Sequence, residues 1–210
     1  MIACVGFGWK KSTPPVTDVI VETPPPPPTI QQHQTLFRGL PFSTGELASG
    51  LPNHSSQGCS GCHSQNAAEW STSRHARSLQ NANLLLAADN ANDDRCLSCH
   101  RPLVEQAEEI DEQPNELFDA TLVSEGVTCA ACHLRNGVVV GVNELEESVV
   151  PHNTEWSPDL SSAAACAPCH QLTWPGASTP LYDTVGEWSR SPHAAAGLQC
   201  QSCHMKPDPG

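Results

Sequence analysis

The segment Cys129-Ala130-Ala131-Cys132-His133 has the form C-x-x-C-H, and the chain contains this pattern five times in its 210 residues. Two cysteines at this spacing, followed at once by histidine, form the attachment signature of c-type haem. The thiols bond to the porphyrin, and the adjacent histidine is placed at the iron. A disulfide scaffold or a set of zinc ribbons would not explain why histidine follows every pair. We therefore expect five covalently attached haem c groups with their irons, anchored by Cys59, Cys62, Cys96, Cys99, Cys129, Cys132, Cys166, Cys169, Cys200 and Cys203.

The histidines divide evenly between these motifs and the rest of the chain. The motif histidines, which we expect to be the proximal iron ligands, are His63, His100, His133, His170 and His204. The chain has ten histidines, so five remain for the five opposite axial positions. Methionine offers no competition, because Met1 is terminal and Met205 directly follows a motif histidine. We therefore expect bis-histidine ligation of every iron and low reduction potentials, with the distal ligands being His33, His54, His75, His152 and His193.

The composition predicts a fold that depends on its cofactors. Aromatic residues make up 5% of the chain, which contains 19 prolines and 14 glycines, so side chains alone would form a thin core. The motifs begin at positions 59, 96, 129, 166 and 200, a quasi-periodic spacing. We expect a mostly irregular fold with short α-helices and minimal β-structure, organised around a row of five haems. The expected helices span 66–79, 81–89, 101–112 and 183–189, and residues 137–142 form the only β-like run.

The charge balance bears on partners. Ten Lys and Arg residues against 23 Asp and Glu residues give a formal net charge of -13. Nucleic-acid binding requires a basic face to neutralise phosphates, so this class of partner is disfavoured. Acidity would lower the reduction potentials of nearby irons and attract basic partners. It would equally serve to keep an exported protein soluble, and the sequence leaves both interpretations open.

The first 32 residues differ in character from the rest. The run from Pro24 to Pro28 is typical of an extended, semi-rigid spacer. Cys4 is either a lipidation site, which would tether the protein to a membrane, or a free or intermolecular thiol. We expect residues 1–32 to form a leader with a linker and residues 33–210 to form the haem domain. Because haem attachment of this kind follows export, we expect an extracellular or cell-surface location, or alternatively a periplasmic one.

A repeated element carries a family resemblance. Residues 69–76 and 187–194 both have the form E-W-S-x-S-x-H-A. This element beside C-x-x-C-H, with the closing C-x-x-C-H-M at Cys200 to Met205, resembles multihaem cytochromes related to the nitrifier tetrahaem cytochrome and the hydroxylamine oxidoreductase group. The resemblance covers roughly residues 58–205 and implies that His75 and His193 are distal ligands. The chain departs from the group in having no C-x-x-C-K motif, and nothing marks Tyr182 as a haem cross-link.

Two classes of function follow from the ligand count. If every axial position is filled, the irons are limited to electron transfer, and we expect no catalytic residues. The chain would then be a membrane-tethered conduit or the repeating unit of a filament, delivering electrons to other redox proteins or extracellular acceptors. In haem density the chain also resembles extracellular cytochrome filaments, which implies a homo-polymer in which His33 ligates a haem of the adjacent subunit. The alternative is a periplasmic redox enzyme, or its soluble electron donor, acting on a small nitrogen or sulfur compound at an open iron.

Overall fold

The computed structural model describes residues 41–206 apart from 92–96, 111, 144–149 and 174–176. Four predictions fall outside this part of the chain: the leader and linker over residues 1–32, the lipidation of Cys4, the ligand role of His33 and the anchoring role of Cys96. In the described part, no helix is long and apolar enough to cross a membrane.

The helices are short, and several comprise little more than one turn. They are α1 (Ser56–Ser60), α2 (Ser64–Thr72), α3 (Ala82–Ala91), α4 (Leu97–His100), α5 (Cys129–His133), α6 (Ala167–His170), α7 (Thr184–Ser189), α8 (Pro192–Ala195) and α9 (Gln201–His204). Single turns of 3-10 helix, such as η3 (Val104–Gln106) and η4 (Ala120–Leu122), connect them. Helices α3 and α7 lie where the sequence predicts them. Helix α2 ends earlier than expected, because the backbone becomes extended at Ser73, whose hydroxyl then accepts a hydrogen bond from the Ala76 amide.

The expected helix over residues 101–112 is wrong. The segment instead forms η3 and the short strand β1 (Glu109–Ile110). The buried Gln106 amide accepts a hydrogen bond from the Leu103 amide and donates to the carbonyls of Glu125 and Gly126. These contacts with residues about twenty positions away hold the segment in an irregular conformation. Tertiary hydrogen bonds therefore override the local helical pattern.

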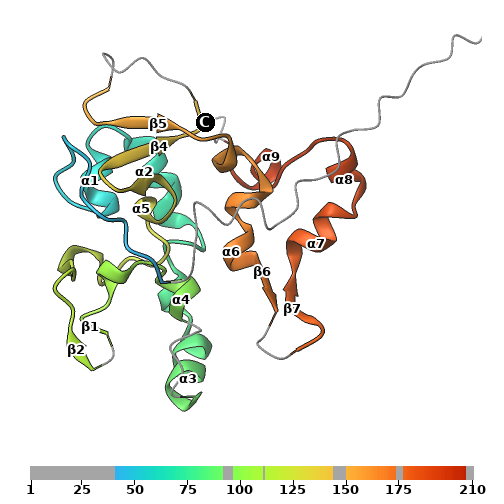
Figure 1. Ribbon diagram of the computed structural model, residues 1–210, viewed down its shortest axis with the longest axis horizontal. Coiled ribbons are helices and arrows are strands. Elements are labelled where there is room, and N and C mark those ends of the chain that lie inside the picture. The colour runs from blue at the N-terminus through green and yellow to red at the C-terminus, as the bar shows by residue number, and fades with distance from the viewer. Residues whose placement is uncertain (1–40, 92–96, 111, 144–149, 174–176, 207–210) are drawn as a thin grey trace, which may run out of the picture.

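The strands are two to four residues long and form three small sheets (Figure 1). Strand β1 pairs with β2 (Gln113–Pro114), and β6 (Gln171–Thr173) pairs with β7 (Pro180–Asp183), both antiparallel. Strand β4 (Val138–Gly141) lies between β3 (Leu134–Arg135), to which it is antiparallel, and β5 (Thr154–Trp156), to which it is parallel. Strand β4 matches the predicted strand over 137–142. The expectation that it is the only β-run is wrong, because strands this short are set by pairing rather than by a visible alternation.

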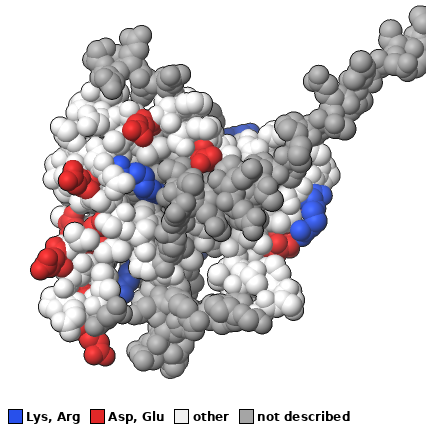
Figure 2. All heavy atoms as spheres, viewed as in Figure 1, with Lys and Arg blue, Asp and Glu red and all other residues white. Residues whose placement is uncertain are grey.

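The core consists of small clusters rather than one continuous interior. The larger cluster contains Ala48, Leu103, Leu122, Ala130, Ala131 and Leu134, and the smaller one contains Ala163, Ala167 and Val185. Figure 1 shows the corresponding halves side by side, with α1, α2, α5, β4 and β5 in one and α6 to α9 with β6 and β7 in the other. Asp and Glu side chains are spread over the described surface of the first half in Figure 2, in keeping with the acidic composition.

Candidate functional site

Each described C-x-x-C-H motif is wound into about one turn of helix. The His63 amide donates to the Cys59 carbonyl at 3.0 Å, and the His204 amide donates in the same way to the Cys200 carbonyl at 3.0 Å. Residues at positions i, i+3 and i+4 of a helix lie on one face. Both thiols and the imidazole of a motif therefore come to the same side of the backbone. This is the arrangement that haem attachment requires.

Motifs that are far apart in the chain meet through their cysteines. Thiols of different motifs are hydrogen-bonded in three pairs: Cys59 with Cys129, Cys99 with Cys169, and Cys166 with Cys200. The first motif thus lies against the third, and the fourth lies against both the second and the fifth. The sequence spacing alone does not predict this order, because it suggests that successive motifs are neighbours.

The contacts between motifs shift the pKa values of several of these thiols. A hydrogen bond from Cys129 lowers the pKa of Cys59 to about 7, although burial and the nearby Glu125 charge oppose the shift. The same contact, with burial, raises the pKa of Cys129. Burial and the charge of Cys200 raise the pKa of Cys166 to about 12. In the contact between Cys59 and Cys129, Cys59 therefore favours the thiolate and Cys129 favours the thiol.

Two motif histidines lie opposite a histidine from another segment. The ring centroids of His63 and His152 are 6.4 Å apart, and those of His75 and His170 are 6.2 Å apart. Imidazole nitrogens lie about 2 Å from a bound metal, and each ring centre lies roughly 1.1 Å behind its nitrogen, so a metal ion between two imidazoles separates the centroids by about 6.2 Å. Both spacings therefore fit one iron ligated from both sides. Burial and the charge of His170 lower the pKa of His75, which favours the neutral imidazole that a metal binds.

Among the described residues, four histidines have a partner at the Nδ1 atom. The partners are the Ser78 carbonyl for His100 at 3.0 Å, the Val140 carbonyl for His133 at 2.8 Å, the Thr154 hydroxyl for His152 at 3.0 Å and the Asp119 carboxylate for His54 at 3.3 Å. A metal-binding histidine usually donates its second ring N–H to such a group, which fixes the ring and leaves the other nitrogen for the metal. The Nε2 atom of His54 is buried and has no hydrogen-bond partner in the described structure.

The two E-W-S-x-S-x-H-A elements are docked by the same pair of hydrogen bonds. In the first, the Trp70 indole donates to the Val127 carbonyl at 2.8 Å, and the Val127 amide donates to the His75 carbonyl at 3.0 Å. In the second, the Trp188 indole donates to the Leu198 carbonyl at 2.9 Å, and the Leu198 amide donates to the His193 carbonyl at 3.0 Å. Val127 and Leu198 each lie two residues before a motif cysteine.

The repeat therefore extends beyond the element itself. The first module contains the motifs at Cys59 and Cys129 with the element 69–76. The second module contains the motifs at Cys166 and Cys200 with the element 187–194. In each module the leading cysteines of the two motifs are in contact. Sequence reasoning found the repeated element but missed the glycine that precedes each docking residue, Gly126 and Gly197, although both are visible in the sequence.

The predicted distal histidines are placed differently from one another. His75 and His152 each lie opposite a motif histidine, and His54 directs a buried nitrogen away from Asp119. His193 is exposed, and within the described residues it has no histidine ring opposite it. No sequence pattern identifies the polar partners of the rings, because Asp119 and Val140 belong to no motif.

One family model matches the chain: cytochrome c554 and c-prime, over residues 58–134. The match supports a c-type cytochrome. It spans the first three motifs and the whole element 69–76, and it supports covalently bound haem c and electron transfer. No curated protein and no solved structure matches the chain. The donor set fits the cofactor, because motif turns present two thiols and an imidazole, and facing rings leave room for an iron.

Proposed function

We propose that this cytochrome is a non-catalytic electron conduit in which five haem c groups are each ligated by two histidines. The two facing histidine pairs, 6.4 Å and 6.2 Å between ring centroids, carry the proposal. A haem iron with both axial positions filled exchanges electrons but has no position for a substrate. The chain itself anchors each group through a motif turn and orients the imidazoles through their Nδ1 partners.

The contacts between motifs support a continuous path. Because anchoring thiols of different motifs are within hydrogen-bonding distance, the groups that they hold would lie side by side. The contacts join the first motif to the third and the fourth to both the second and the fifth. The facing pair of His75 and His170 joins the two modules. These links would connect all five groups with one another, although in a different order from the one that the motif spacing suggests.

In the cell, the conduit would act outside the cytoplasm, as a filament subunit or as a protein tethered through a lipid on Cys4. The proline run before residue 29 suits a spacer that holds the domain away from a surface. In a filament, His33 would ligate an iron of the neighbouring subunit, and such a head-to-tail contact generates an open helical assembly.

An enzyme, or its soluble electron donor, acting on a small nitrogen or sulfur compound is the second candidate. One observation favours it: among the described residues, facing histidine rings accompany only two of the five motif histidines. An iron left without a second imidazole would have an open position for a substrate.

Haem counting combined with spin-state spectroscopy separates the two functions. We expect the purified protein to carry five haems per chain, to give only low-spin EPR signals and to bind no carbon monoxide. A stoichiometric high-spin signal that is lost on adding carbon monoxide would instead support the enzyme.

The filament is tested separately with His33→Ala. We expect this variant to lose filaments in electron micrographs and to gain one high-spin iron per chain. Filaments that form normally from a fully low-spin variant would refute the donated ligand.

A further inference from the structure

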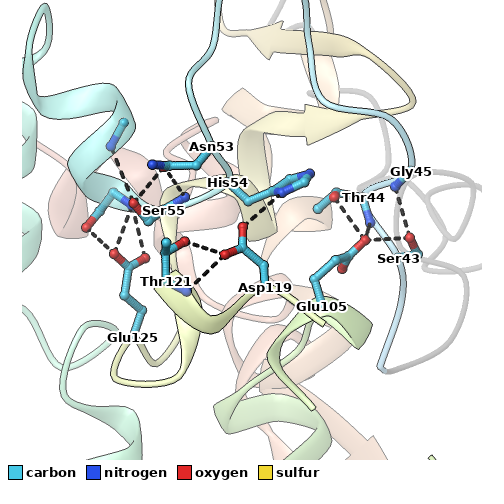
Figure 3. A network of polar contacts seen from close by, with 12 residues as sticks. Ser43, Thr44, Gly45, Asn53, His54, Ser55, Glu105, Asp119, Thr121 and Glu125 are labelled. Carbon is cyan, nitrogen blue, oxygen red and sulfur yellow. Dashed lines mark hydrogen bonds and ion pairs between the residues drawn. The ribbon is translucent and has the colours of Figure 1, made fainter. Parts of the chain in front are cut away.

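Asp119 is held by its own neighbours in an orientation that reaches His54. It caps η4, where one carboxylate oxygen, Oδ1, accepts hydrogen bonds from the Thr121 amide at 2.9 Å and the Thr121 hydroxyl at 2.6 Å. The other oxygen, Oδ2, lies 3.3 Å from Nδ1 of His54 (Figure 3). Two bonds to one residue thus fix the carboxylate before it meets the imidazole.

His54 is fixed from its own side as well. The Asn53 side chain accepts hydrogen bonds from the amide and hydroxyl of Ser55, and the Ser55 hydroxyl caps α1 (Figure 3). The side chain of His54 is only 17% exposed, and its buried Nε2 atom has no partner in the described structure. A buried polar nitrogen without a partner requires an explanation, and a metal ion is the one that suits an imidazole.

His54 differs from the other histidines in the charge of its partner. The Nδ1 partners of His100, His133 and His152 are neutral oxygens, namely two backbone carbonyls and a hydroxyl. Among the described histidines with an Nδ1 partner, His54 alone contacts a carboxylate. A carboxylate partner raises the basicity of a metal-bound imidazole more than a neutral partner does, and a more basic ligand stabilises the oxidised metal.

We propose that Asp119 is a positioning residue, which aims Nε2 of His54 at a haem iron and holds that iron at a lower reduction potential than neutral partners would. The inference rests on the proposed function. The iron concerned is one of those bound by His100, His133 or His204, because His63 and His170 already face other histidines.

The test is Asp119→Asn in the haem-loaded protein, which keeps the shape of the side chain and removes its charge. We expect one of the five midpoint potentials to rise, so that the ratio of reduced to oxidised haem at its original midpoint increases about tenfold, the lower end of the effect of losing an outer-shell partner. A tenfold change corresponds to about 59 mV for one electron. One low-spin EPR signal should also move. Asp119→Ala removes the orientation too, and we expect it to add a high-spin signal.

Two matched controls separate this role from general effects. Asp183→Asn removes the same charge at a carboxylate that contacts Arg190 and Gln171 but no described histidine. Thr154→Val removes the neutral partner of His152. We expect a smaller shift than that of Asp119→Asn from each control. Potentials in Asp119→Asn that match those of Asp183→Asn would overturn the proposal.

The failure of this inference is distinguishable from the failure of the proposed function. If His54→Ala retains five low-spin irons, His54 is not a ligand and the inference fails, while electron transfer through closed irons stands and only the bis-histidine ligation of one iron is lost. If the unmodified protein carries fewer than five haems or contains an open iron, the conduit fails whatever the Asp119 variants show.

Discussion

The first and second modules are built on the same hydrogen bonds but are enclosed by different amounts of protein. In both, an indole N–H and a histidine carbonyl hold the residue two positions before a motif cysteine. The first module packs against Leu103, Leu122 and Leu134, whereas the core of the second is Ala163, Ala167 and Val185. The difference indicates that docking of the repeated element depends on local backbone contacts rather than on a large apolar interior.

The modules also differ in whether the histidine of the repeated element has another histidine ring opposite it. His75 of the first module lies opposite His170 of the second, so one module supplies a ring to the other. His193 occupies the equivalent place in the second module, yet no described histidine ring lies opposite it. The common construction therefore positions the histidine, and the surroundings decide whether another ring lies opposite it.

Removing the histidines is expected to have the largest effect. In His75→Ala, the imidazole opposite His170 is lost, so we expect one iron to become high-spin in EPR spectra. If the modules are equivalent, His193→Ala produces a second high-spin iron of the same kind. A fully low-spin spectrum for His193→Ala would show that the two modules are not equivalent. A fully low-spin spectrum for His75→Ala would refute the assignment of His75 and His170 to one iron.

Gly126 and Gly197 precede the docking residues Val127 and Leu198, and replacing each with alanine should destabilise the two modules to different extents. A Cβ atom at Gly126 would lie 2.5 Å from the His75 carbonyl oxygen, which is backbone and cannot move cheaply. At Gly197 a Cβ atom meets nothing within 4 Å, but the residue has a φ of +75°. We expect Gly126→Ala to cost about 3 kcal/mol through overpacking. Gly197→Ala should cost about 1 to 2 kcal/mol through backbone strain. Chemical denaturation measures the loss in the free energy of unfolding for both variants. Equal losses would contradict the closer approach of the backbone to Gly126 in the first module.

Removing the tryptophan hydrogen bonds should also destabilise the first module more than the second, but by a smaller amount. Trp70→Phe leaves a partly buried carbonyl of Val127 without its donor, and we expect a loss of about 1 to 3 kcal/mol in the free energy of unfolding. The bond from Trp188 is more exposed, so water replaces it and Trp188→Phe should cost about 0.5 to 1.5 kcal/mol. If Trp188→Phe lowered the free energy of unfolding more than Trp70→Phe in the same assay, the prediction that the first module depends more on this bond would be wrong.

The smallest effect concerns pH and the second module alone. Hydrogen bonds from Arg190 and Gln171 lower the pKa of Asp183. A carboxyl group whose folded pKa is depressed adds stability above its unfolded pKa, and that stability is lost as the pH falls through the folded value. We therefore expect Asp183→Asn to lower the thermal midpoint slightly at neutral pH and to match the unmodified protein in strong acid. A difference that persists undiminished in acid would show that the charge is not the cause.

The sequence predicts what is local and misses what is distant. The C-x-x-C-H turns and helices α3 and α7 follow from short patterns, because their hydrogen bonds join residues a few positions apart. Asp119 lies 65 positions from His54, and no spacing rule connects them. The failed helix over 101–112 has the same cause, since Gln106 bonds to the backbone at 125 and 126. The motif spacing likewise suggests that each motif lies beside the next one in the chain. The contact between Cys59 and Cys129 instead brings the first motif beside the third.

The pairing of thiols from separate motifs has a consequence for biogenesis. In an oxidising compartment, two hydrogen-bonded cysteines are one oxidation away from a disulfide, which would consume the sulfurs that the porphyrin needs. We therefore expect the nascent chain to be kept reduced and unfolded until each vinyl group has reacted. Mass spectrometry of chain secreted without haem should then reveal a covalent link between Cys59 and Cys129, and its absence would argue that the contact forms only around the cofactor.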